Sequence, residues 1–88
     1  MKANALVARN LRLLRVKQNP SQENLAVDAG VDRTYVSRLE RGLENPTVAV
    51  LDRLASALNA EIVDFFRVPA KGEPLPRPLR SGRRRSKP

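Results

Sequence analysis

The spacing of apolar residues predicts helices separated by short polar breaks. Between residues 4 and 17, leucines and valines recur at steps of three and four, with arginines between them, as in an amphipathic helix. The apolar residues of this first helix are Val7, Leu11 and Leu14, with Leu6 and Leu13 beside them. Asn19-Pro20 ends the helix, because the residue before a proline is biased away from the helical conformation.

A short second helix and a glycine turn follow. Ser21 is a good N-cap for a helix over residues 22–29, because its hydroxyl can accept a hydrogen bond from a free amide of the first turn. Gly30 can adopt the left-handed conformation that ends a helix, and Val31 can then point inward. We therefore expect the chain to turn sharply at Gly30.

The third predicted helix has one apolar face and one polar face. Asp32 caps it, and it extends to about Arg41, where Gly42 stops it. Val36 and Leu39 face inward. The side chains left free to point outward are Arg33, Thr34, Ser37, Arg38 and Arg41.

Two further helices are predicted after the polar loop at Asn45-Pro46. Thr47 can cap the fourth helix, and a shorter fifth helix covers roughly residues 61–66. The expected buried stripe of the fourth helix is Val48, Leu51, Leu54, Ala55 and Leu58.

The net charge of +8 is concentrated in the last twenty or so residues. Residues 1–68 carry ten Lys and Arg against eight Asp and Glu, whereas residues 69–88 carry seven against one. The latter segment has five prolines and almost nothing apolar to bury, so we expect a folded domain over 1–68 and a disordered, basic tail over 69–88. Charge alone therefore does not identify the domain as DNA-binding.

The composition narrows the possible functions. The chain has no Cys and no His, which excludes disulfide frameworks, Cys/His zinc sites, thiol nucleophiles and imidazole acid–base chemistry. Its N-terminal residues resemble neither a signal peptide nor a membrane span, so we expect a soluble, cytoplasmic protein that associates with the nucleoid through DNA. We expect no cofactor and no enzymatic activity.

The segment over residues 21–42, from Ser21 to Gly42, has the pattern of a helix-turn-helix. Such a motif needs a short helix, a turn containing Gly, and a second helix that is apolar inside and polar outside. Leu25 and Ala26 face the core, and Ala26 is small enough to let the two helices approach closely.

A longer set of residues resembles the lambda-repressor-like (Cro and XRE-type) family of phage repressors and bacterial regulators. The resemblance covers about residues 5–66 and implies an all-α, five-helix fold. Its motifs are Arg15, Ser21 to Ala26, Gly30-Val31, Ser37 to Gly42, Asn45-Pro46-Thr47 and Leu51 through Leu58. The stretch from Asp32 to Ser37 further resembles restriction-modification controller proteins, which are small homodimers that time the expression of restriction genes.

The resemblance assigns roles to individual positions. It implies that Arg33, Thr34 and Arg38 reach base edges, and we expect Ser37 to join them as a base contact. It places Gln22 against a DNA phosphate at the start of the second helix. The further backbone contacts expected on this ground are Tyr35, Arg41 and Asn45. It also implies an ion pair between Arg15 and Glu40 that ties the first helix to the third.

The chemistry of arginine favours the same assignment. Its planar fork matches the two acceptors that guanine presents in the major groove, a contact that gives about 1–3 kcal/mol of discrimination. Arg33 and Arg38 are therefore the leading candidates for guanine contacts. Thr34 can place its methyl against that of thymine or use its hydroxyl on a phosphate or a base.

The predicted fifth helix carries more apolar surface than a small domain can bury. The resemblance implies that Ile62 and Phe65 are its core positions, yet Val63 and Phe66 are also apolar. We therefore expect the fourth and fifth helices, with Val63 and Phe66 prominent, to form a homodimer interface, which would place two recognition helices on a palindromic operator.

Other functions remain open on the sequence alone. An antitoxin or a protein-binding transcription adaptor could use the same fold, although an adaptor has no need of base-reading groups on the third helix. The carboxylates show no spacing typical of a nucleophile with its base. No segment after the fifth helix is suited to hold an effector, so we expect double-stranded DNA and a second copy as partners, with no membrane and no small-molecule effector.

Overall fold

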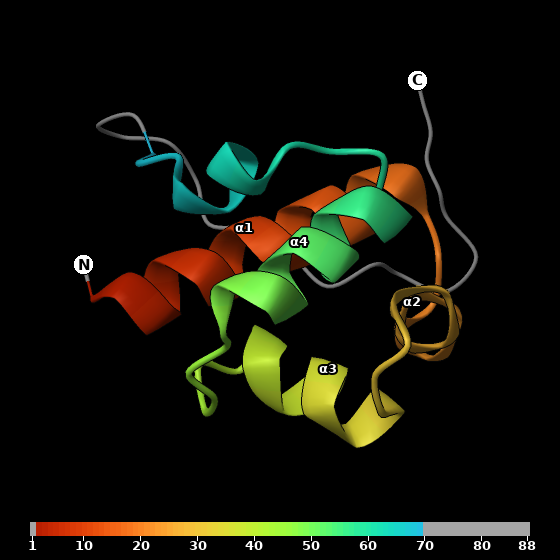
Figure 1. Ribbon diagram of the computed structural model, residues 1–88. Helices are drawn as coiled ribbons and strands as arrows, with labels where there is room; N and C mark the ends of the chain where they lie inside the picture. Colours follow the sequence, from red (N-terminus) through yellow and green to blue (C-terminus); the bar gives the residue numbers. More distant parts are fainter. Residues whose placement is uncertain (1, 70–88) are drawn as a thin grey trace.

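Four α-helices and one short 3₁₀ helix make up residues 2–69, the part of the chain that this computed structural model describes (Figure 1). The elements are α1 (Ala3–Gln18), α2 (Gln22–Ala29), α3 (Arg33–Glu40), α4 (Val48–Ala57) and the 3₁₀ helix η1 (Ile62–Phe66). No strand occurs in this part of the chain. The all-α fold predicted from the sequence is confirmed. The expected tail, residues 69–88, lies outside the described residues apart from Pro69.

The helices begin and end where the local chemistry predicts. α1 ends at Asn19, which adopts a left-handed φ of 73° and donates its backbone N–H to the carbonyl of Arg15. At the start of α4, the Thr47 hydroxyl accepts a hydrogen bond of 3.1 Å from the backbone N–H of Val50. Both contacts satisfy backbone groups that a helix end would otherwise leave free.

The core lies between α1, α2, α3 and α4, and η1 closes it. α1 packs on η1 and on α3, whereas α2 packs on α3 and α4. Figure 1 shows α3 at the lower edge of the molecule, so one long side of this helix is left uncovered by other helices. The buried apolar side chains are Val7, Leu11, Leu25, Ala26, Ala29, Val36, Leu39, Leu51, Leu54, Ala55, Leu58 and Phe65.

The start of α4 differs from the prediction. Val48 was expected in the buried stripe, but its side chain is 73% exposed. As the first residue of α4, it directs its side chain back past the helix end, where no other element covers it. The other residues expected in that stripe are buried.

The last element is a single 3₁₀ helix held by a buried amide. Asn10, 2% exposed, donates from Nδ2 to the carbonyls of Phe65 at 2.8 Å and Arg67 at 2.9 Å. Its Oδ1 accepts from Nη1 of Arg9 at 3.0 Å. Five residues are too few for a stable α-helix, so tertiary contacts fix the shape of this segment.

Within residues 2–69, none of the helices combines the length and the apolar character needed to cross a lipid bilayer.

Candidate nucleic-acid interface

Two caps and a glycine fix the geometry between α2 and α3. The Ser21 hydroxyl accepts from the backbone N–H of Asn24 at 2.9 Å and so begins α2. Gly30 has a φ of 72°, which favours glycine, and the N–H of Val31 returns to the carbonyl of Ala26 at 2.9 Å. A carboxylate oxygen of Asp32 then accepts from the N–H of Thr34 at 2.9 Å and begins α3. The turn is therefore specified residue by residue.

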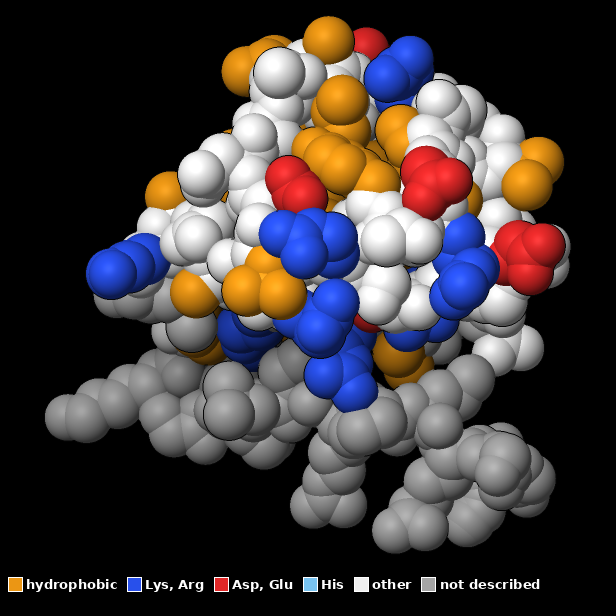
Figure 2. Space-filling model, turned by 90° about the horizontal axis from the view of Figure 1, so that it is seen from below, with side chains coloured by type: hydrophobic (Ala, Val, Ile, Leu, Met, Phe, Trp, Pro, Cys, Tyr) orange, Lys and Arg blue, Asp and Glu red, His pale blue; other side chains and the backbone are white. Residues whose placement is uncertain are grey.

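α3 has a fully buried inner face and an open outer face. Val36 and Leu39 are 0% exposed, which anchors the helix on the core. Of the side chains expected to contact bases, Arg33, Thr34 and Arg38 are exposed and Ser37 is half-buried. Figure 2 views the molecule from the side on which α3 lies; Lys and Arg side chains gather on this face, with Asp and Glu side chains among them. The outer face of α3 is thus available to a ligand.

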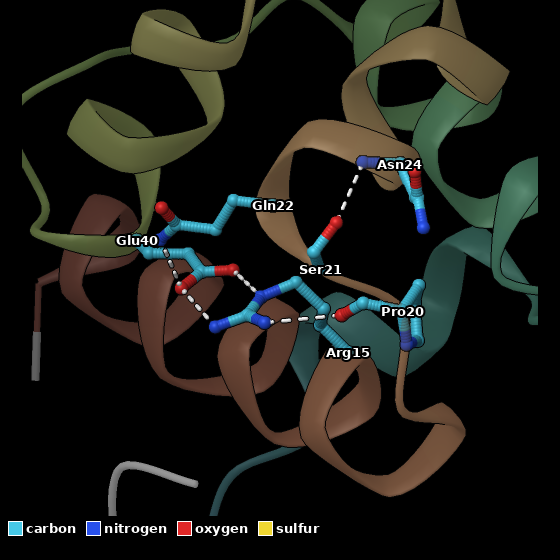
Figure 3. Close-up of polar contacts among 6 residues, drawn as sticks. All are labelled: Arg15, Pro20, Ser21, Gln22, Asn24 and Glu40. Carbon is cyan, nitrogen blue, oxygen red and sulfur yellow. Dashed lines mark hydrogen bonds and ion pairs between the residues drawn. The ribbon is translucent and has the colours of Figure 1, made fainter. Parts of the chain in front are cut away.

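A buried ionic network holds α3 against α1 and α2 (Figure 3). Arg15 donates from Nε to Oε2 of Glu40 at 2.5 Å and from Nη2 to Oε1 at 3.1 Å, and the two side chains are 13% and 4% exposed. Nη1 of Arg15 also donates to the carbonyl of Pro20 at 3.1 Å. The ion pair expected between Arg15 and Glu40 is present, in a two-pronged geometry that suits a guanidinium.

Gln22 belongs to the same network. Its Nε2 donates to Oε1 of Glu40 at 3.0 Å, so the Glu40 carboxylate on α3 binds side chains of both α1 and α2. A glutamine amide carries two N–H groups, and this bond uses one of them. Gln22 therefore supports α3 directly and retains a donor for a further acceptor.

Arg38 is exposed, as expected, but it is paired with an acid that was not foreseen from the sequence. Its Nε donates to Oε2 of Glu44 at 2.7 Å, and its Nη2 lies 3.4 Å from the carbonyl oxygen of Leu43. The two side chains are 44% and 30% exposed, so the pair lies on the surface. Glu44 was not predicted as a site residue. The signal that could have indicated it is an acidic residue two positions after Gly42, the glycine that ends the helix.

Tyr35 lies between the core and the surface. It is half-buried and packs against the buried cluster. Burial raises the pKa of its hydroxyl, and the nearby carboxylate of Glu44 raises this pKa further. Tyr35 therefore remains protonated at neutral pH and can donate a hydrogen bond.

The loop after α3 is fastened to the start of α1. Gly42 adopts a φ of 75°, and its carbonyl accepts from Nδ2 of Asn4 at 3.0 Å. Arg41 and Asn45, both expected to contact the DNA backbone, are exposed, and Gly42 lies between them in sequence. Asn4 was not foreseen as a site residue, because nothing local indicates which backbone group its amide meets.

The two residues expected at a dimer interface are exposed. Val63 is 66% exposed and Phe66 is 43% exposed, whereas Phe65, between them in sequence, is fully buried. Phe66 lines a hollow of about 140 Å³ together with Ala3, Val7, Pro46 and Leu51 and with the polar residues Asn4 and Asn45.

Curated relatives are similar to this chain over more than half of its length. The HTH-type transcriptional regulator SlrR of Bacillus subtilis is 36% identical over 62 residues, which are 69% of this chain and 41% of that protein. A Neisseria meningitidis protein described as a hypothetical transcription factor is 46% identical over 54 residues, 61% of this chain and 51% of that protein. This chain thus spans about half, or less, of the length of these two relatives.

A solved structure has the same architecture. The restriction-modification controller protein C.AhdI from Aeromonas hydrophila superposes with a TM-score of 0.70 at 38% identity, covering 72% of this chain and 96% of that chain. A family model described as helix-turn-helix matches residues 11–65, which include α2, the glycine turn and α3. Because that match covers more than half of the sequence, the chain belongs to the helix-turn-helix family HTH_3.

Proposed function

We propose that this protein is a sequence-specific DNA-binding transcriptional regulator that inserts α3 into the major groove. The observation that carries the proposal is the contrast between the two faces of α3. Its inner face is buried and its end is held by the Arg15–Glu40–Gln22 network, while exposed Arg and Thr side chains line the outer face. A rigid helix with polar side chains outward is the geometry that major-groove readers use. The family match and the names of the relatives support this function.

The proposed base contacts come from α3. Arg33 and Arg38 contact guanine, while Thr34 and Ser37 contact neighbouring base edges or methyl groups. Each has the exposure or partial exposure that such a contact requires.

The proposed backbone contacts surround these residues. Gln22 donates its second N–H to a phosphate at the start of α2, where free helix amides already favour an anion. Tyr35, Arg41 and Asn45 contact the sugar-phosphate backbone from the edges of α3 and the following loop. These contacts position the domain on DNA and carry no sequence information by themselves.

We extend the proposal to a homodimer. The exposed Val63 and Phe66 form an apolar surface that a second copy can cover. A symmetric dimer places two α3 helices about 34 Å apart, one turn of DNA, and so reads a palindrome.

Selection of bound sequences from random duplexes tests the DNA-binding proposal. We expect a short palindromic motif to be enriched by the full chain. Arg33→Ala is expected to lose preference at a particular base pair, whereas Gln22→Ala weakens all sites alike. Failure to enrich any motif would refute the proposal and favour a protein-binding adaptor.

Sedimentation of the full chain tests the dimer separately. We expect a dimer at micromolar concentration for the natural sequence and a monomer for Val63→Asp. Val27→Asp is the matched control, because Val27 is 72% exposed but lies on α2, away from η1 in sequence. A monomer at high micromolar concentration for the unchanged chain would refute the dimer.

A further inference from the structure

The Arg38–Glu44 pair links a proposed base-reading side chain to a loop acid. An exposed pair of this kind contributes little to folding stability. An acid on the DNA-facing side also repels phosphates, so it lowers the affinity for every duplex. The position of Glu44 therefore calls for a role other than stability or general affinity.

The two contacts occupy one edge of the Arg38 guanidinium. Glu44 meets Nε, and the carbonyl of Leu43 lies near Nη2. A guanidinium has five N–H donors in a fixed plane, and the edge formed by Nη1 and Nη2 still presents two parallel N–H groups. That edge fits the O6 and N7 acceptors of guanine. The pair with Glu44 thus leaves the base-reading edge open while it restricts rotation of the side chain.

The backbone that carries Glu44 is itself fixed. The N–H of Gly42 bonds to the carbonyl of Leu39 at 3.0 Å, and the N–H of Leu43 bonds to the carbonyl of Arg38 at 3.0 Å, which is the Schellman pattern at a helix end. This pattern ends α3 and fixes the path of the residues that follow it. Asn4 holds the Gly42 carbonyl from α1. Glu44 is therefore placed against Arg38 by bonds that do not involve DNA.

We propose that Glu44 is a positioning residue that sets the orientation of the Arg38 guanidinium for guanine and so raises discrimination at that base pair at the expense of general affinity. The inference rests on the proposed DNA-binding function. Because the side chain is ordered before binding, less rotamer freedom is lost when the base contact forms.

Two substitutions in the full chain separate orientation from charge. Glu44→Gln removes the charge, and Glu44→Asp keeps the charge but shortens the reach to Arg38. The probes are the selected operator duplex, a duplex changed at the base pair whose preference Arg38→Ala relaxes, and a random duplex. The quantity compared is the ratio of the affinities for the first two, measured at one salt concentration.

We expect both variants to lower the ratio of operator affinity to changed-duplex affinity by about three- to tenfold. This loss is part of the discrimination that a two-pronged arginine contact provides. Glu44→Gln also binds random duplex more tightly, whereas Glu44→Asp binds it as the natural chain does. Asp52→Asn is the matched control, since Asp52 is an exposed acid on α4, and it leaves the ratio unchanged. Circular dichroism confirms that the variants remain helical.

A ratio that is unchanged, or that rises, in Glu44→Asp would overturn the inference, as would an Arg38→Ala variant that keeps every base preference. Both results leave sequence-specific DNA binding by α3 intact, although the second removes Arg38 from the proposed base contacts. If the natural chain enriches no motif at all, the proposed function and this inference fail together, and that result is distinct from the first two.

Discussion

Replacing Arg15 by alanine leaves the Glu40 carboxylate, whose side chain is 4% exposed, without its cation. Glu40 would keep one hydrogen bond, from Gln22, and lose both bonds from Arg15. Removing one partner of a buried ion pair costs about 3–5 kcal/mol, and the partial exposure of Arg15, 13%, places this case near the lower end. We therefore expect the free energy of unfolding to fall by about 3 kcal/mol.

That loss is large for a domain of this size. At about 0.05–0.15 kcal/mol per residue, the folded part of the chain has a total stability of only a few kcal/mol up to about 10. Urea unfolding followed by far-UV circular dichroism measures the change, provided that the slope against urea is the same in both proteins. Arg15→Lys keeps the charge but loses the fork, so we expect a smaller loss, about 1–2 kcal/mol.

Two controls test the reasoning. Lys17→Ala removes an exposed cation from the same helix, and we expect a change within about 0.5 kcal/mol. Replacing Arg15 by Met and Glu40 by Leu together removes both charges, and we expect it to restore much of the stability lost by Arg15→Ala. An Arg15→Ala loss below about 1 kcal/mol would show that the pair behaves like an exposed one and that burial of Glu40 does not make it essential to folding.

Three further predictions concern other features. Asn10→Ala leaves the carbonyls of Phe65 and Arg67 without their amide donor and is expected to lower the free energy of unfolding in urea by about 2 kcal/mol; a change under about 0.5 kcal/mol would contradict this role. Gly42→Ala forces a side chain into a φ of 75° and is expected to cost about 1 kcal/mol in the same assay, with no loss if the loop can adopt another conformation. Deleting residues 69–88 removes a net charge of +6, so we expect weaker binding to operator and random DNA alike and a shallower salt dependence in titrations; unchanged affinity and slope would exclude a role of the tail in binding.

Local signals in the sequence were enough to place the helices. Ser21, Asp32 and Thr47 act as caps, and Gly30 adopts the left-handed turn that its position predicts. These features depend on residues within one helical turn, so they can be read from the chain alone. Two predictions about tertiary packing also hold, since Phe65 is buried and the Arg15–Glu40 pair forms; both came from the family resemblance.

The features that were not foreseen depend on contacts between distant segments. Nothing in the sequence around Asn10 indicates that its amide meets carbonyls more than fifty positions away. Val48 has the right spacing for the core, but burial depends on whether a neighbouring element covers the first turn of α4. The pairing of Arg38 with Glu44 depends on the direction in which the chain leaves α3, which the Gly42 turn sets.

The side chains that hold α3 in place, Arg15, Gln22 and Glu40, are different from the side chains on its outer surface that are proposed to read bases. Of the proposed base contacts, Arg33, Thr34 and Ser37 take no part in the bonds to Glu40. A library randomised at these three positions is therefore expected to yield mostly folded proteins, because the substitutions leave the buried contacts intact. New operator preferences could be selected from this scaffold without redesigning its core, provided that Arg38 and Glu44 are varied as a pair.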